Sequence, residues 1–155
     1  MKFADYNFME KLNGAALKAF INDHCKKHRV RLKRGFFKVE KPMHVFKKLF
    51  TKTGTRVIAN LIIPAGALIY CDHDAFNGYS CINWRKMRAS EAFVHSLVKQ
   101  LNHESVSEAV SWHDKKFKYH PGKSVKPTMH FSMEEYQCDF GIHFFVNLAD
   151  AAAWM

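Results

Sequence analysis

The chain has 155 residues, of which 48% are hydrophobic and 14 are phenylalanine; these values are typical of one globular domain and exclude a disordered basic tail. No apolar run approaches the roughly 18 residues of a membrane span, and the first residues lack the apolar core of a signal peptide, so we expect a cytoplasmic protein without a membrane partner. The net charge of +10 lies in one third of the chain: residues 1–56 hold 15 Lys and Arg against 4 Asp and Glu (+11), and residues 57–155 hold 9 against 10 (−1).

The first predicted element is a basic helix over about residues 14–29, where apolar residues recur with helical spacing. It leads into a basic block of six cations without an acid: Lys26, Lys27, Arg29, Arg31, Lys33 and Arg34. Val30 and Leu32 alternate with three of these cations, which an extended backbone would place on one face, suited to phosphates. We expect residues 1–35 to form a basic, mostly helical portion that binds nucleic acid or an acidic host-protein surface; the alternative is a solvated face.

Short apolar segments after Gly35 predict a sheet. We expect strands at 36–39, 57–63 and 68–71, a strand followed by helix or loop over 89–101, and a buried strand at 142–146; residues 45–50 fit either a helix or a strand. Asn147 is a plausible N-cap for a closing Ala-rich helix. The predicted fold is α+β, a single compact domain over residues 1–155 with a mixed or antiparallel sheet. One sheet should bury six apolar residues: Ile58, Leu61, Ile63, Ile142, Phe144 and Val146.

Cysteine and histidine positions give only a weak metal signal. The chain has four cysteines, far apart in sequence: Cys25, Cys71, Cys81 and Cys138. In a reducing compartment we expect them to be free thiols. His24 and His28 would share one helix face beside Cys25, but a structural zinc needs two more ligands and no Cys-x-x-Cys pair is present. We therefore expect no metal and no cofactor, with zinc at His24, Cys25 and His28 as the alternative.

Five ordered motifs carry a resemblance to a known family. They are Val57 to Ile63 with Pro64-Ala65-Gly66-Ala67, Arg85 to Ala92, Ser111-Trp112-His113-Asp114, Tyr119-x-Pro121-Gly122-Lys123, and Cys138-x-x-Gly141-Ile142-His143-Phe144-Phe145. The match covers roughly residues 57–154 and resembles an uncharacterised domain of tailed phages and giant DNA viruses, often found beside pentapeptide repeats. The resemblance implies a viral origin and supplies no activity. Its motif residues without an assigned role are Arg88, His113, Asp114, Tyr119, Gly122, Gly141 and His143.

An enzyme built around His113, Cys138 and His143 is the alternative to a binding module. His113 followed by Asp114 could be an oriented base, but neighbours on a strand point to opposite faces, so we expect a turn in which Asp114 bonds nearby backbone. We expect His143, inside an apolar strand, to be a core histidine. Residues 140–145 are also faintly similar to a nicotinamide-holding strand of ADP-ribosyltransferases, but no glutamate follows Glu135. Binding without a catalytic residue is therefore the favoured hypothesis.

Overall fold

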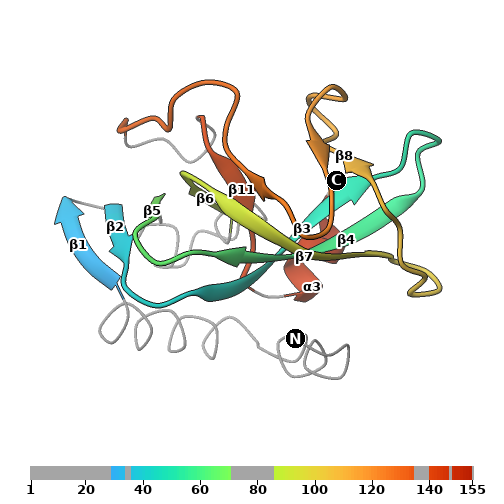
Figure 1. Cartoon of the computed structure of the whole chain (residues 1–155), viewed down its shortest axis with the longest axis horizontal. Helices are drawn as coiled ribbons and strands as arrows, with labels where there is room; N and C mark the ends of the chain where they lie inside the picture. The colour runs from blue at the N-terminus through green and yellow to red at the C-terminus, as the bar shows by residue number, and fades with distance from the viewer. Residues whose placement is uncertain (1–28, 34–35, 71–85, 135–139, 147, 155) are drawn as a thin grey trace.

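The part of the chain that the structure describes folds into two antiparallel sheets with one short helix (Figure 1). The computed structural model describes residues 29–33, 36–70, 86–134, 140–146 and 148–154. Their elements are β1 (Arg29–Lys33), β2 (Phe36–Val39), β3 (Met43–Phe50), β4 (Arg56–Ile63), β5 (Leu68–Tyr70), β6 (Met87–Ala89), β7 (Ala92–Lys99), β8 (Ala109–Val110), β9 (Lys118–Tyr119), β10 (Ser124–Val125), β11 (Ile142–Phe144) and α3 (Leu148–Ala153). None of the helices in these ranges is long and apolar enough to cross a membrane.

The α+β prediction, with its basic helical N-terminal portion, is wrong: the fold is mostly β. The described part of that portion, β1, is a strand paired with β2. Residues 14–28 of the predicted helix, like residues 1–13, lie outside the described residues. The physical reason for the error is that Val30 and Leu32 alternate with cations, a strand pattern that begins where the helical spacing ends. The ambiguous segment 45–50 is also strand, as part of β3.

Three runs of chain each pass from one sheet into the other. The first sheet has the order β1-β2-β5-β6-β11 and the second has the order β10-β7-β4-β3-β8-β9. Thus β2 continues into β3, β4 into β5, and β6 into β7. The three runs lie side by side in the same order in both sheets, as β2-β5-β6 in the first and β3-β4-β7 in the second. The bends lie at Pro42, at the turn that contains Gly66 (φ 89°), and at Ser90, whose Oγ accepts a hydrogen bond from the Leu68 N–H at 2.9 Å. Strands that switch sheets at such bends are typical of orthogonally packed β-structures.

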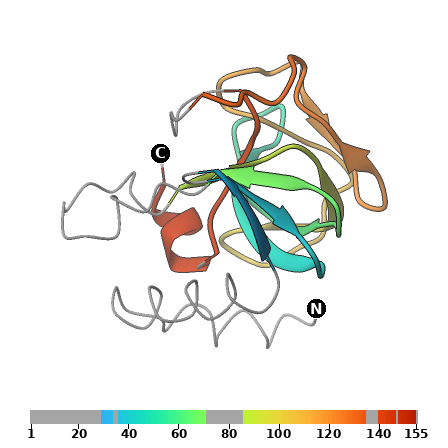
Figure 2. The same cartoon turned by 90° about the vertical axis from the view of Figure 1, so that its left-hand side faces the viewer.

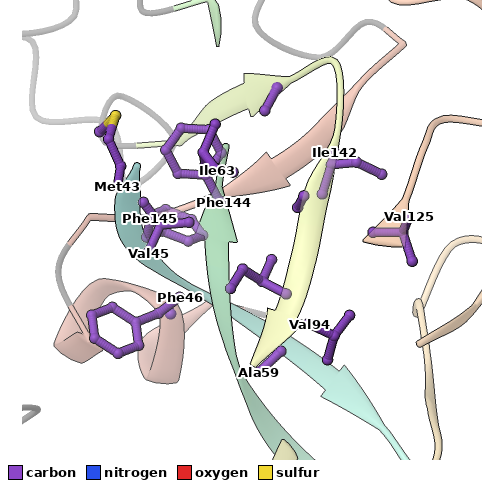
Figure 3. Close-up of a cluster of buried hydrophobic side chains, with 14 of the residues drawn as sticks. Met43, Val45, Phe46, Ala59, Ile63, Val94, Val125, Ile142, Phe144 and Phe145 are labelled. Atoms are coloured by element: carbon purple, nitrogen blue, oxygen red, sulfur yellow. The ribbon is translucent and has the colours of Figure 1, made fainter. Parts of the chain in front are cut away.

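One apolar core lies between the two sheets (Figure 3). It joins Leu61 and Ile63 of β4 to Ile142 and Phe144 of β11. All six residues predicted to be buried are buried, at 4% exposure or less. The prediction that they share one sheet is wrong, because β4 and β11 belong to different sheets. The two sheets meet at a bridge between Phe46 and Phe145.

The helix α3 packs on β3 (Figure 2), and a lysine side chain fixes it there. The Lys48 side chain is only 9% exposed, and its Nζ donates hydrogen bonds to the carbonyl oxygens of Ala152 and Trp154, each at 2.6 Å. Carbonyl groups at a helix C-terminus have no partner inside the helix, so a cation there is favourable. The predicted N-cap, Asn147, lies outside the described residues. The closing helix itself is confirmed at 148–153.

Candidate functional site

A pocket of about 800 Å³ opens where the two sheets meet, beside β3 and β11. The loop between β8 and β9 and the segment 127–129 complete its walls. Its apolar lining comes from Phe117, Pro127, Met129, Phe140, Ile142 and Trp154, and its polar lining from Lys47, Lys86, Ser111, His113, Asp114, Thr128 and His143. Large, mostly apolar pockets with a few convergent polar groups are where small molecules bind.

Most of the motif residues that carried the family resemblance line this pocket. His113, Asp114, Tyr119, Gly141 and His143 all contribute to its wall. They come from three separate parts of the sequence, so the fold brings the motifs together. The remaining two, Arg88 and Gly122, have structural roles that are described below.

Lys47 is half-buried on β3, on the same face as two residues of the core. Successive residues of a strand alternate between its faces, so Lys47 shares a face with Val45 and Leu49, which are fully buried. Its Nζ donates a hydrogen bond to the carbonyl oxygen of His143 at 2.9 Å. Burial, together with the charge of Lys86, lowers the pKa of Lys47 to about 8. Within the described part of the chain, no carboxylate forms an ion pair with Lys47.

Lys86 supplies a second cation to the same pocket. It lies just before β6 and is only 8% exposed. Its Nζ lies 4.5 Å from the centre of the Trp154 ring, a cation–π contact. The Trp154 ring also packs on Phe145, with ring centres 5.5 Å apart. Two lysines and an indole therefore line the same largely apolar pocket.

The two histidines of the pocket differ in their surroundings. His113 is exposed and lies in the loop between β8 and β9. The predicted turn there is confirmed: Asp114 Oδ1 accepts a hydrogen bond from the Lys116 N–H at 3.0 Å. His143 is half-buried at the pocket wall, so the prediction of a core histidine is wrong. The third residue of the proposed enzyme site, Cys138, lies outside the described residues, as do the other three cysteines and His24 and His28.

Arg88 is completely buried and ties a distant segment to the first sheet. Its Nη1 donates to the carbonyl oxygens of Ser132 (2.6 Å) and Phe140 (3.0 Å), and its Nη2 donates to that of Glu134 (2.6 Å). The guanidinium also lies over the rings of Tyr70 (4.8 Å) and Phe131 (4.7 Å). Sequence reasoning missed this role, and the available signal was a single cation inside the short apolar strand β6.

Two motif glycines have backbone explanations. A Cβ on Gly141 would lie 2.9 Å from the Cβ of Arg88, closer than real contacts allow, so glycine lets the chain pass beside the buried arginine. Gly122 has a φ of 82°, which favours glycine, and its N–H donates to the Val94 carbonyl at 2.7 Å. Both glycines are therefore explained by the backbone of the fold, and neither needs a role in ligand binding.

The described part of the basic block lies at the edge of the first sheet opposite the edge that lines the pocket. Arg29, Arg31 and Lys33 belong to β1, the edge strand opposite β11 in the first sheet. The pairing of β1 with β2 shifts between Arg31 and Lys33, which interrupts the regular alternation used to predict one cationic face. Lys26, Lys27 and Arg34 lie outside the described residues. Among the residues that are described, no three His, Cys, Asp or Glu side chains gather as a metal site.

Comparison with known proteins gives a family and no activity. The model of a family of unknown function, DUF5758, matches residues 32–151. The match begins 25 residues before the motif-based resemblance (57 − 32), so β2 and β3, with Lys47, are within the family's domain. No curated protein and no solved structure matches the chain. The chain therefore belongs to the family of unknown function DUF5758.

Proposed function

We propose that the protein binds a small organic anion in the pocket beside β3 and β11. The observation that carries this proposal is the pair of lysines, Lys47 and Lys86, in the lining of a largely apolar cavity of about 800 Å³. The effect of Lys86 on the pKa of Lys47 is repulsive, and an anion between the two ammonium groups would relieve it. Charged hydrogen bonds are also stronger away from water than in it.

The rest of the pocket suits a ligand with a flat apolar body. Phe117 and Ile142 line one part of it, and the Trp154 indole lies next to Lys86. Met129 and Phe140 are 55% and 53% exposed, which is unusual for such large apolar side chains, and both belong to the pocket wall. A bound aromatic body would cover them. We therefore expect ligands with a carboxylate, sulfonate or phosphate on an apolar scaffold.

The first test uses 8-anilinonaphthalene-1-sulfonate, an aromatic sulfonate whose fluorescence rises in an apolar site. Lys47→Met and Lys86→Met should each weaken its binding about tenfold or more, since one charged hydrogen bond contributes roughly 1.5–3 kcal/mol. Lys41→Met is the matched control, because Lys41 is exposed and does not line the pocket. Equal affinity for all four proteins in a fluorescence titration would contradict an anion site at these lysines.

A second candidate function is binding of nucleic acid through the basic block. It is supported by the charge of residues 1–56 and by the position of β1 at a sheet edge, opposite the edge that lines the pocket. Phosphates neutralised by Lys or Arg release counterions, so the affinity should fall steeply with salt. An acidic protein surface could bind to the same cations through its carboxylates, without any nucleic acid.

We expect the salt dependence of duplex DNA binding to report on this block. Four to six engaged cations predict a log–log slope of roughly −3 to −5, at about −0.9 per phosphate. Replacing Arg29, Arg31 and Lys33 with Ala should flatten the slope by about 2 to 3 units for all sequences alike. Replacing Lys41, Lys123 and Lys126, which are exposed elsewhere, is the control. No binding at ~50 mM salt, where such contacts are strong, would leave an acidic host protein as the partner.

The five ordered motifs also support a proposal about origin. They resemble a domain of tailed phages and giant DNA viruses, so we infer a viral accessory protein that acts in the cytoplasm of its host. The charge asymmetry of the chain suits a partner of the host or of the viral nucleic acid. Detection of the protein in infected cells by mass spectrometry, with its cellular fraction, tests this proposal.

A further inference from the structure

We propose that Lys47 forms a covalent imine with an aldehyde or ketone group of the anion that binds in the pocket. This inference rests on the proposed function and names the chemistry of its ligand: an organic anion that carries a carbonyl group. The argument begins with the position of the side chain. Lys47 projects from the core-facing side of β3, a strand paired on both edges, so its amine is held by a rigid part of the fold.

The contacts of the Lys47 amine differ from those of three other lysine amines. Lys48 is engaged by two carbonyl oxygens near the end of α3, and Lys99 forms an ion pair with Glu104 at 2.9 Å. Lys86 lies over the Trp154 ring. Lys47 lines the pocket, and its Nζ makes one hydrogen bond, to the His143 carbonyl. An ammonium group with one neutral acceptor in an apolar pocket is poorly stabilised compared with one in an ion pair.

The surroundings favour the neutral amine, which is the nucleophilic form. With a pKa of about 8, roughly a quarter of Lys47 is unprotonated at pH 7.5, whereas an ordinary lysine is about 0.1% unprotonated. The titratable and charged groups that face the pocket from its other walls are Lys86, His113, Asp114, Tyr119 and His143. Burial in an apolar site next to a second cation is a known way of activating a lysine nucleophile.

The proposed step is balanced and needs no oxidant or reductant. The lone pair of neutral Nζ attacks the carbonyl carbon, and the C–N bond forms as the carbonyl π bond breaks. The resulting carbinolamine gains a proton on its oxygen and loses the nitrogen proton, so that water leaves and the C=N bond forms. The net change is amine plus carbonyl giving imine plus water. Lys86, the second cation of the pocket, would hold the anionic group of the same molecule.

The test uses pyridoxal 5′-phosphate only as a probe, because it joins an aldehyde, a phosphate and a flat ring. The full-length protein is incubated with the probe at pH 7.5 and reduced with sodium borohydride, and labelled lysines are mapped by peptide mass spectrometry. We expect Lys47 to be labelled at least tenfold faster than Lys41 and Lys52, which are exposed. Its labelling rate should rise with pH to a plateau with a midpoint near 8, whereas the exposed lysines should show no midpoint below about 10.

Two controls separate the covalent step from binding. Pyridoxine 5′-phosphate lacks the aldehyde and should protect Lys47 from labelling by competition. Lys47→Arg keeps the positive charge and cannot form the imine, so it should still bind pyridoxine 5′-phosphate but show no label in the pocket. If the wild type binds this competitor and labels Lys47 no faster than Lys41, the imine is wrong and the anion site stands. If neither phosphate binds, the proposed function itself fails.

Discussion

Replacing Arg88 with Met should cost the protein about 3–5 kcal/mol of its free energy of unfolding. Three carbonyl oxygens, from Ser132, Glu134 and Phe140, accept hydrogen bonds from the buried guanidinium. A buried polar group that loses its partner costs about 1–3 kcal/mol. The methionine would fill part of the volume under the rings of Tyr70 and Phe131. It would remove the donor from all three carbonyls, of which the Phe140 carbonyl keeps a hydrogen bond from the Ser132 N–H at 3.1 Å. Equilibrium unfolding in urea measures the loss.

The alternative is that Arg88→Met stabilises the protein, because apolar replacement of a buried ion pair is often neutral or stabilising. That result requires both partners to be replaced. Here the carbonyl acceptors belong to the backbone and remain in every variant, so we expect the loss to dominate. Arg88→Lys should recover only part of it, since one ammonium group cannot reproduce the planar guanidinium that reaches three carbonyls. Arg56→Met, at an exposed position, is the control. A loss below about 1 kcal/mol for Arg88→Met would overturn this account.

The same arginine indicates why the pocket depends on the fold. Arg88 donates a hydrogen bond to the carbonyl of Phe140. The next residue, Gly141, lies so close to the arginine side chain that there is no room for a Cβ. Both residues 140 and 141 line the pocket. Loss of Arg88 should therefore weaken binding of the sulfonate probe and also cost several kcal/mol of stability. Loss of Lys86 should weaken binding of the probe and cost much less stability than loss of Arg88. The two classes of variant distinguish residues that build the pocket from residues that contact its occupant.

The apolar segments of the sequence predicted most of the strands but not how they assemble. Residues 57–63 and 142–146 are buried as expected, because continuous apolar runs fit covered strands. Their division between two sheets depends on bends at Pro42 and Ser90 and on pairing between distant segments. A run of apolar residues carries no information about which sheet it joins. The functional prediction was based on the basic block in the charged N-terminal third, whereas the one residue of that third that lines the pocket, among those the structure describes, is Lys47.

Lys47 and Lys48 show most clearly what local sequence could not predict. Two adjacent lysines in a β-segment are typical of a solvated strand, yet both are engaged. The carbonyl bonded by Lys47 lies 96 residues away in sequence, and those bonded by Lys48 lie 104 and 106 residues away. Because neighbours on a strand face opposite sides, one lysine enters the pocket and the other holds α3. The motif residues His113 and His143 were identified from sequence, but Lys47, which lines the same pocket, could be found only from the fold.

The pH dependence of stability should differ between the wild type and Lys47→Met. In the native state the pKa of Lys47 is lowered to about 8, and the ordinary value is 10.5. Between these values the unfolded chain binds more protons than the native chain, so the free energy of unfolding rises with pH across this window. A difference of this size corresponds to a rise of up to about 3 kcal/mol. Below pH 8 both states are protonated and the contribution is constant.

The informative quantity is therefore the free energy of unfolding of the wild type minus that of Lys47→Met. Both are measured by urea unfolding at intervals from pH 7 to pH 10.5. Burial raises the pKa of Tyr119, so its contribution to stability is lost as the pH rises above about 10. Lys48 also has a lowered pKa, chiefly through burial. Both groups are present in both proteins and cancel in the difference. We expect the difference to be flat below pH 8 and to rise toward pH 10.5 in favour of the wild type. A difference that stays flat throughout would mean that Lys47 is solvated like an ordinary lysine, and would remove the basis for its neutral amine.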